Sequence, residues 1–337
     1  MSRVLSVEDL SIGFRSEGQD FTVVRDVSFT LDAGKTLALV GESGSGKSVT
    51  SLGIMGLLPS PPQSHISGRI ILHGDDGDTD LLSLAEARMR GLRGDRIAMI
   101  FQEPLTSLNP VQTVGNQIVE AIRSHRRVSR GQARTRAVEL LEQVGIPDAP
   151  DRLGTYPHEL SGGMRQRIMI AIALALEPDI LIADEPTTAL DVTVQAQILD
   201  LLRRLQRETG MAMLFITHDF GVVADIADRT IVMYAGQTVE EGQTDTVLSD
   251  PLMPYTIGLM NAVPRLETAG LKQGNLKTIE GFVPDPAALP AGCAFHPRCG
   301  YMQKGLCDTP PTPIEDAGGG HMVRCKRWQQ IAEGHHT

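Results

Sequence analysis

The sequence has no cysteine before position 293, and its apolar runs are short. The longest, from Ile168 to Leu176, is far below the about 20 residues that a membrane-spanning helix needs. The N-terminal segment reaches Glu8 and Asp9 before an apolar stretch of signal-peptide length can form. We therefore expect no membrane span and no secretion signal, and a chain that stays in the cytosol.

Positive charge is in deficit in this chain of 337 residues. Its 31 Lys+Arg stand against 41 Asp+Glu, which gives a formal net charge of −10 at pH 7. This balance argues against broad, sequence-independent binding of nucleic acid. With 41% hydrophobic and 21% charged residues, the composition is that of a globular protein, and the length suggests about two domains.

The cysteines are confined to the C-terminal end of the chain, at Cys293, Cys299, Cys307 and Cys325. Disulfides are disfavoured in a reducing compartment, where grouped thiolates more often form a metal or cluster site. His296 and His321 lie in the same region. Because four thiolates already complete a ligand set, we expect these two histidines to be structural residues of a surface loop, not ligands.

The apolar pattern predicts an α/β core. Strands of an antiparallel β-layer come first, then buried strands that alternate with helical segments, as in a parallel sheet. The expected strands cover residues 4–10, 21–30, 36–40, 96–101, 180–183, 213–217 and 230–234, and the expected helical segments cover 113–145, 192–209 and 220–227. Beyond Gly242 proline and glycine become frequent, so we place a domain boundary near there and expect no long elements after it.

A phosphate-binding loop is predicted directly after the strand at 36–40. The segment from Gly41 to Ser48 reads G-E-S-G-S-G-K-S, which fits G-x-x-x-x-G-K-[ST], and a helical stretch follows it. The glycines let backbone N–H groups curl round phosphates, and the start of the helix favours negative charge. Lys47 can reach the β- and γ-phosphates, and the Ser48 hydroxyl can bind Mg²⁺.

An acidic pair follows the buried strand at 180–183. A P-loop needs a carboxylate for its metal, and Asp184 is placed to supply it. Glu185, the next residue, is placed to orient the attacking water or to accept its proton. A solvated turn is the alternative interpretation of an acidic pair that stands alone.

Four further motifs resemble those of the ATP-binding-cassette (ABC) ATPases. Residues 160–167 read L-S-G-G-M-R-Q-R, similar to the family's signature motif, with Met164 where many members have glutamine. Gln102 matches the Q-loop, residues 189–191 the D-loop and His218 the switch histidine. The resemblance covers about residues 4 to 242. It implies a P-loop NTPase fold with an antiparallel β-layer, a parallel-sheet core and a helical subdomain.

The resemblance also implies an ATP site shared by a head-to-tail dimer. Glu185, His218, Gln102 and Lys47 are the expected catalytic residues, and Ser48, Gln102 and Asp184 the expected Mg²⁺ ligands. The expected nucleotide-binding residues are Phe14, Gly41, Ser43, Gly44, Ser45, Gly46, Lys47, Ser48, Val49, Gln102, Ser161, Gly162, Gly163, Asp184 and Asp191. The open alternatives are a core phenylalanine at Phe14, a plain helix N-cap at Ser161 and a core histidine at His218.

Within the family, residues 102–110 and 156–167 closely resemble the oligopeptide/dipeptide/nickel importer ATPases, and residues 250–266 resemble their C-terminal extension. The four cysteines fall where longer members carry a four-cysteine motif, some of which hold a [4Fe–4S] cluster. Zn²⁺ and free thiols are the alternatives, although the spacing lacks the paired C-x2-C of many zinc sites. A regulatory, redox-sensing role of this region is a further suggestion.

These resemblances imply an ABC ATPase domain at 1–245, with its helical subdomain at about 104–165, and a C-terminal extension at 246–337. The implied function is ATP hydrolysis that powers peptide import, at the cytoplasmic face of the inner membrane. The implied partners are two permease subunits, a second and paralogous ATPase subunit, and a substrate-binding protein reached through the permease. A nickel or other small-solute importer is the alternative, and a DNA-repair or translation ABC ATPase is the rival class.

Overall fold

The computed structural model describes residues 2–16, 18–75, 77–102, 107–188, 190–262 and 279–335. The chain divides into two compact units. The first unit is made of residues 1–5, 31–35 and 71–216, and the second of residues 6–30, 36–70 and 217–337. The predicted domain boundary at residue 245 falls inside the second unit and stays a prediction, as does the extent of the helical subdomain, whose residues 104–106 lie outside the described part.

Three parallel strands form the sheet of the first unit. β7 (Ile180–Asp184) lies between β6 (Ile97–Ile100) and β8 (Ala212–Thr217), with Ile180 in register with both Ile97 and Ala212. The side chains of β7 and β8 are buried throughout, as expected for strands covered on both faces. The predicted parallel core is therefore confirmed in this unit.

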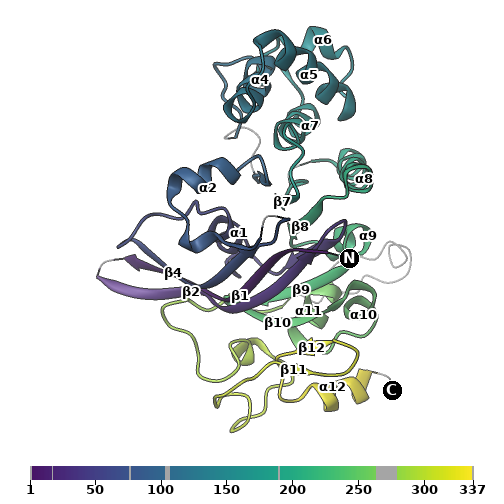
Figure 1. The fold of residues 1–337 in the computed structure, drawn as a ribbon. Helices are drawn as coiled ribbons and strands as arrows, with labels where there is room; N and C mark the ends of the chain where they lie inside the picture. Colours follow the sequence, from purple (N-terminus) through teal and green to yellow (C-terminus); the bar gives the residue numbers. More distant parts are fainter. Residues whose placement is uncertain are drawn as a thin grey trace, which may run out of the picture. The chain divides into compact units, whose positions relative to one another are not determined.

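The helices of the first unit follow from capping and spacing. α4 (Val114–His125) starts where the Thr113 hydroxyl accepts the N–H of Asn116, and α5 (Arg130–Gln143) starts with a capping box between Ser129 and Gln132. Both helices contact α7 (Gly162–Ala173), and Figure 1 shows these three close together with α6 (Ala149–Arg152). The other elements are α2 (Glu86–Leu92), α8 (Val192–Thr209), β5 (Thr79–Asp80) and the 3-10 turns Leu81–Ser83 and Pro157–Glu159.

The second unit is built on the strand order β3-β9-β10-β12-β11. β3 (Thr36–Val40) runs parallel to β9 (Arg229–Tyr234), and β10 (Gln237–Gln243) is antiparallel to both β9 and β12 (Met322–Val323). The short strand β11 (Glu315–Asp316) closes this edge. The sequence pattern did not predict β10, β11 or β12. β11 and β12 have two residues each, too few for a periodic signal, and β10 has the largely polar sequence Q-T-V-E-E-G-Q.

The remaining elements of the second unit surround that sheet. A second sheet has the order β2-β1-β4, formed by β1 (Arg3–Ser16), β2 (Gln19–Asp32) and β4 (Ser64–Leu72), and the end of β4 pairs antiparallel with β5. The helices are α1 (Lys47–Ile54), α9 (Phe220–Ile226), α10 (Thr244–Ser249), α11 (Pro254–Ala262) and α12 (Trp328–His335), with a 3-10 turn at His296–Arg298. The predicted shortness of elements after Gly242 is confirmed, since α11 has nine residues.

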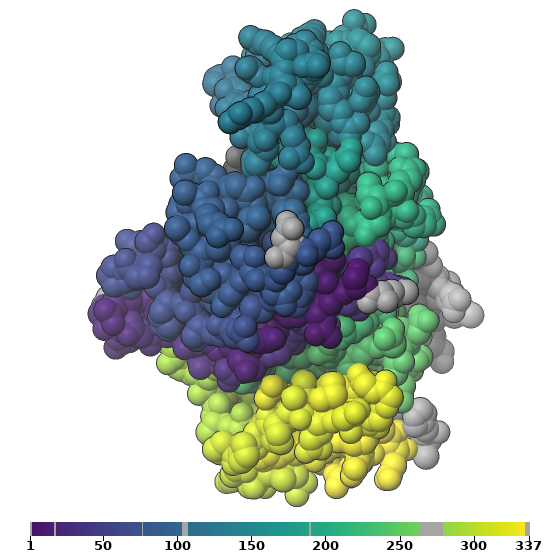
Figure 2. Space-filling model, in the orientation of Figure 1, coloured from purple at the N-terminus to yellow at the C-terminus, as the bar shows by residue number. Residues whose placement is uncertain are grey.

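One core joins the C-terminal residues to the sheet. The rings of Tyr234, Tyr255 and Phe295 lie with centroids 4.6 to 5.3 Å apart, and Val323 of β12 packs in the same cluster. In Figure 2 the C-terminal residues, drawn in yellow, form one continuous mass. Across the part of the chain that the structure describes, no helix is both long and apolar enough to cross a membrane.

Candidate functional site

The predicted phosphate-binding loop connects β3 to α1 in the second unit. Gly41 has φ 153°, and a Cβ on it would lie 2.2 Å from the carbonyl oxygen of Met233, so no other residue fits there. Gly46, at φ 100°, is the N-cap of α1. The loop thus turns directly from a buried strand into a helix, in the strand–loop–helix context that the motif requires.

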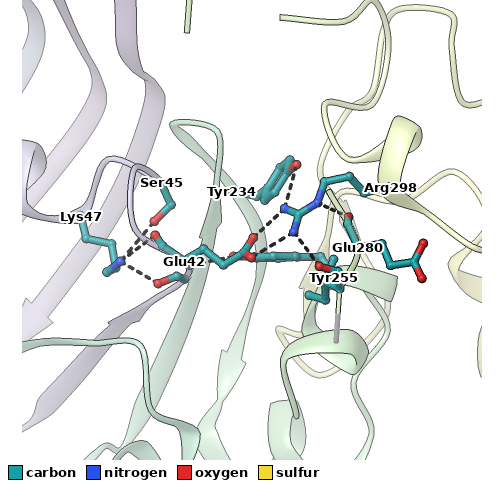
Figure 3. A network of polar contacts seen from close by, with 9 residues as sticks. Glu42, Ser45, Lys47, Tyr234, Tyr255, Glu280 and Arg298 are labelled. Atoms are coloured by element: carbon teal, nitrogen blue, oxygen red, sulfur yellow. Dashed lines mark hydrogen bonds and ion pairs between the residues drawn. The ribbon is translucent and has the colours of Figure 1, made fainter. Parts of the chain in front are cut away.

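Lys47 is folded back over this loop. Its side chain is buried, and Nζ donates to the carbonyl oxygens of Gly41 at 2.6 Å and Glu42 at 3.0 Å. Figure 3 shows the ammonium group held against these carbonyls, with the Ser45 hydroxyl 3.4 Å away. Ser43 and Gly44 at the tip of the loop are exposed, while Ser48 and Val49 are half-buried. A cation and the N-terminus of a helix therefore meet at an accessible loop, which suits an anionic ligand.

The predicted acidic pair lies at the end of β7 in the first unit. Asp184 is buried, and Glu185 has φ 45°, the left-handed region, which costs a residue other than glycine about 1 kcal/mol. The N–H of Glu185 is fixed by a 2.9 Å bond to the carbonyl of Ile216. This sharp turn places the two consecutive carboxylates in different surroundings. Asp184 is buried at the end of β7, whereas Glu185 is half-buried beyond it.

Gln102 and Glu185 are brought together across 83 positions of sequence. The Gln102 amide donates to Oε2 of Glu185 at 2.9 Å, and the Thr188 hydroxyl donates to the same oxygen at 2.9 Å. Gln102 and Glu185 were predicted as site residues from the sequence, whereas Thr188 was not. Its only signal was a hydroxyl three residues after the carboxylate.

The signature and D-loop residues open two neighbouring helices of the first unit. The Ser161 hydroxyl accepts the N–H of Met164 at 3.3 Å at the start of α7, and the Asp191 carboxylate accepts the N–H of Val194 at 2.9 Å at the start of α8. Both side chains are thus helix N-caps, as the alternative for Ser161 predicted. A Cβ on Gly163 would lie 2.8 Å from a methyl of Val194, and Gly162 is exposed. Ala189 of the D-loop lies outside the described residues.

Phe14 and His218 belong to the second unit with the phosphate-binding loop. Phe14 is half-buried and packs against Phe21, with ring centroids 6.2 Å apart and planes inclined by 34°. His218 follows β8 and is exposed, so the alternative of a core histidine is wrong. Asp219, the next residue, caps α9 through the N–H of Gly221 at 2.8 Å. The cap fixes where the chain leaves the strand and so fixes the position of His218.

All four cysteines line one cavity in the second unit. Cys293, Cys299, Cys307 and Cys325 surround it together with Phe295 and Ile331, and its volume of about 20 Å³ has room for about one water molecule. Burial above all, together with the other three cysteines, raises the pKa of the Cys325 thiol to about 12. Burial likewise raises the pKa of Cys293 and of Cys299. The convergence of four distant cysteines agrees with one shared site.

The cavity is not arranged as a finished mononuclear metal site. Within the described ranges no group of three His, Cys, Asp or Glu side chains is placed to hold a metal ion. His296 bonds the carbonyl of Cys293 through Nδ1 at 2.9 Å, a structural contact. The prediction that His321 lies in a surface loop is wrong, because the residue is buried and bonded to Glu240 at 2.8 Å. The burial comes from β12, which carries this loop onto β10.

Comparisons with known proteins agree with these features. The ABC transporter family model matches residues 24–188, and the model of the oligopeptide/dipeptide transporter C-terminal region matches residues 239–307. A putative peptide import ATP-binding protein of Brucella abortus (strain 2308) is 54% identical over 338 residues, 98% of this chain and 100% of that protein. The oligopeptide transport ATP-binding protein OppD of Bacillus subtilis (strain 168) is 52% identical over 324 residues, 96% of this chain and 88% of that protein.

Solved structures extend the likeness to the fold. The ATP-binding cassette MJ0796, a dimer in a post-hydrolysis state bound to ADP and Pi, superposes with a TM-score of 0.62 at 28% identity, over 71% of this chain and 98% of that chain. The cassette cbiO1 of Clostridium perfringens gives 0.61 at 25% identity, over 74% and 92%. The chain therefore belongs to the ABC transporter ATP-binding proteins, in the group that carries the oligopeptide/dipeptide transporter C-terminal region.

Proposed function

We propose that this chain is the ATP-hydrolysing subunit of a peptide importer. The observation that carries the proposal is the presence, in one chain, of a P-loop with a buried lysine and of a C-terminal region that matches the oligopeptide/dipeptide transporter model. The relatives named for peptide import and oligopeptide transport span nearly the full chain, which supports a peptide as the cargo. The nickel or small-solute importer and the non-transport ABC ATPase have no such support.

In this proposal the second unit binds the phosphates of ATP. Lys47 exchanges its carbonyl partners for the β- and γ-phosphates, and the loop N–H groups bind the remaining oxygens. The loop residues concerned are Gly41, Ser43, Gly44, Ser45, Gly46, Ser48 and Val49. Phe14 offers a partly exposed ring to adenine, and the exposed imidazole of His218 is available for the γ-phosphate.

The first unit supplies the groups for hydrolysis. Asp184 and Gln102 of this unit are proposed Mg²⁺ ligands, as is Ser48 of the second unit. The ion would neutralise phosphate charge, and oxygen donors of this kind suit it. Glu185 accepts the proton of the attacking water, and for this its Oε2 must be released by Gln102 and Thr188. A change in the hydrogen bonds of Gln102 thus couples the γ-phosphate to Glu185, the proposed base.

A second ATPase subunit completes each site in the proposal. Ser161, Gly162, Gly163 and Asp191 serve the nucleotide held by the P-loop of the partner. The N-terminus of α7, whose first residue Gly162 is exposed, presents N–H groups to the anion. The solved relative that is a dimer bound to ADP and Pi supports this arrangement. We propose a paralogue as the partner.

Two permease subunits are the proposed membrane partners, which would hold the chain at the cytoplasmic face of the inner membrane. The helical part of the first unit carries an open groove of about 540 Å³ between α4 and the start of α5. Val119, Glu120, Arg123 and Arg130 line it, so an amphipathic helix with mixed charge suits it. The substrate-binding protein would act through the permease.

The four-cysteine cavity is proposed as the site of a [4Fe–4S] cluster, with Zn²⁺ as the alternative. Four thiols around one apolar cavity match the donor set of either group, whereas the small volume means that the side chains must turn outward to accept a cluster. The bound group would supply a covalent cross-link of the C-terminal loops. Anaerobically purified protein should contain iron and sulfide near four per chain; an iron-free protein with one zinc would favour the alternative.

Reconstitution tests the function. The chain is combined with its permease, the paralogous ATPase subunit and the substrate-binding protein in vesicles that contain ATP. We expect uptake of a labelled oligopeptide that depends on ATP, and no uptake of nickel. Nickel uptake without peptide uptake would select the alternative cargo, and ATP hydrolysis that needs no permease and moves nothing would select the non-transport class.

A further inference from the structure

An ion pair ties the cysteine-bearing loop to the phosphate-binding loop within the second unit. The guanidinium of Arg298 donates from Nη1 to Oε2 of Glu42 at 2.7 Å and from Nη2 to Oε1 at 3.0 Å. The Arg298 side chain is only 6% exposed and that of Glu42 29%. A planar, two-bond pair that is largely shielded from water has a defined geometry and is stronger than an exposed pair. Figure 3 shows this fork facing the P-loop.

Glu42 is held at three points, each by a different part of the unit. Its N–H donates to the hydroxyl of Tyr255 at 2.8 Å, and its carbonyl accepts from Lys47 at 3.0 Å. Tyr255, on α11, is fully buried. The side chain and N–H of Glu42 thus contact C-terminal residues, whereas its carbonyl contacts the lysine that the proposed function assigns to phosphate. A displacement of Glu42 would therefore change where Lys47 can point.

Arg298 is itself fixed in place. Nε donates to the carbonyl of Glu280 at 2.9 Å, and Nη2 also donates to that of Ile279 at 3.3 Å. The guanidinium lies over the rings of Tyr234 at 5.8 Å and Phe295 at 5.9 Å. The bond to Glu42, above all, raises the pKa of Arg298, so it stays charged. With so many donors engaged, the group acts as a rigid connector rather than a mobile surface charge.

The connector lies in the chain segment between two of the cysteines that line the cavity. Arg298 ends the 3-10 turn His296–Arg298, which joins Cys293 to Cys299. The N–H of His296 donates to the carbonyl of Cys293 at 3.0 Å, and the N–H of Cys299 to that of His296 at 3.2 Å. Because these bonds join the backbone of both cysteines to the turn, a backbone shift at either cysteine would move the guanidinium of Arg298.

We propose that Arg298 is a positioning residue of the nucleotide site, which through Glu42 sets the shape of the P-loop according to the arrangement of the four-cysteine cavity. This inference rests on the proposed function only in that the P-loop must bind ATP. Arg298 acts through Glu42 and Lys47, so its loss should affect nucleotide affinity more than the chemical step.

Four variants of the full chain test this inference by titration with a fluorescent ATP analogue. Arg298→Met should weaken binding about tenfold, equivalent to about 1.4 kcal/mol, and Glu42→Gln should do so to a similar extent. Arg298→Lys, which keeps the charge but not the fork, should restore part of the affinity. Arg324→Met is the matched control: Arg324 precedes Cys325 and donates to the carbonyls of Thr238 at 2.8 Å and Thr312 at 2.9 Å, outside the P-loop.

The double variant separates an effect of Arg298 on the P-loop through Glu42 from a general loss of stability. If Arg298 acts through Glu42, adding Glu42→Gln to Arg298→Met should weaken binding no further, and Arg324→Met should keep normal affinity even if its thermal unfolding midpoint falls. Normal affinity in both Arg298→Met and Glu42→Gln would overturn the inference, as would fully additive losses. A wild-type chain that binds no nucleotide would instead overturn the proposed function, and the inference with it.

Discussion

The amide of Gln102 donates a 2.9 Å hydrogen bond to Oε2 of Glu185, the oxygen that the Thr188 hydroxyl also contacts. Two donors thus contact one oxygen of the proposed base. A carboxylate that accepts two hydrogen bonds is a weaker proton acceptor than a free one. In the proposed function this contact rearranges during hydrolysis, which ties the chemical step to the position of Gln102.

Replacement of Gln102 by Ala tests that tie. The variant loses a hydrogen bond to a charged group and the link to the γ-phosphate, so we expect kcat for ATP hydrolysis to fall about tenfold while KM changes little. Steady-state kinetics of the purified chain measure both. Thr188→Val removes the other donor to the same oxygen and serves as the matched variant. Because Thr188→Val only removes a donor from Glu185, it should not lower kcat, and a loss equal to that of Gln102→Ala would contradict the proposed role of Gln102.

The buried lysine gives a second prediction. Lys47→Ala removes the only positive charge that the second unit's P-loop itself contributes, and we expect nucleotide binding to fall below detection in an equilibrium titration. Lys304→Ala, an exposed lysine of the C-terminal region, should bind as the wild type does. Binding by Lys47→Ala with unchanged affinity would mean that the ammonium keeps its loop carbonyls and never turns to the phosphates.

The contact between Glu240 and His321 should anchor the C-terminal residues to β10. Glu240 accepts from the N–H groups of Leu252 at 2.6 Å and Met253 at 3.2 Å as well as from His321. Glu240→Leu leaves all three without their acceptor, so the free energy of unfolding should fall by about 3 kcal/mol or more. Denaturant titration measures this change.

The control for this prediction is an exposed ion pair. Arg69 contacts Glu8 with side chains 62% and 50% exposed, and Arg69→Ala should change the free energy of unfolding by less than about 0.5 kcal/mol. If Glu240→Leu were as mild as Arg69→Ala, the C-terminal residues would not depend on this contact.

Two carboxyl groups should give pH dependences of opposite sign. Burial raises the pKa of Glu241 from its ordinary value of 4.5, outweighing the nearby Arg229. Such a group stabilises the fold below its unfolded pKa and loses that contribution as the pH rises through the folded pKa. A hydrogen bond from Arg93 lowers the pKa of exposed Glu86, so its contribution is present at higher pH and is lost on acidification.

Unfolding of Glu241→Gln and Glu86→Gln at about pH 4 and about pH 7 checks the signs. Relative to Glu241→Gln, the wild type should lose stability as the pH rises. Relative to Glu86→Gln, it should gain stability over the same interval, although little because the pair is exposed. The same sign in both comparisons would contradict the burial of Glu241.

Local sequence signals account for the parts of the fold that were predicted correctly. β3, the glycine loop and α1 follow one another along the chain, so an apolar run, glycines and a helix start were enough to place Lys47. Contacts between residues far apart in the sequence give no such local pattern. The two-residue strand β12 is too short for a periodic pattern, and so its pairing with β10, and the burial of His321 that follows, could not be foreseen.

The polar network of Figure 3 was missed for a related reason. Glu42 occupies a variable position of the P-loop motif, and Arg298 lies between cysteines. Neither position therefore indicated that the two residues form an ion pair. Only the fold shows that residues 256 positions apart form one ion pair. By contrast, Gln102 and Glu185 were both expected at one site because the motif order of the family assigns them to it.

The central claim is that this chain hydrolyses ATP to drive peptide import, and Glu185→Gln in the reconstituted importer tests it most directly. The variant should bind ATP as tightly as the wild type, while peptide-dependent hydrolysis and peptide uptake both fall by at least about a hundredfold. Undiminished hydrolysis would contradict the assigned base. Peptide uptake that persists without hydrolysis would contradict the account as a whole.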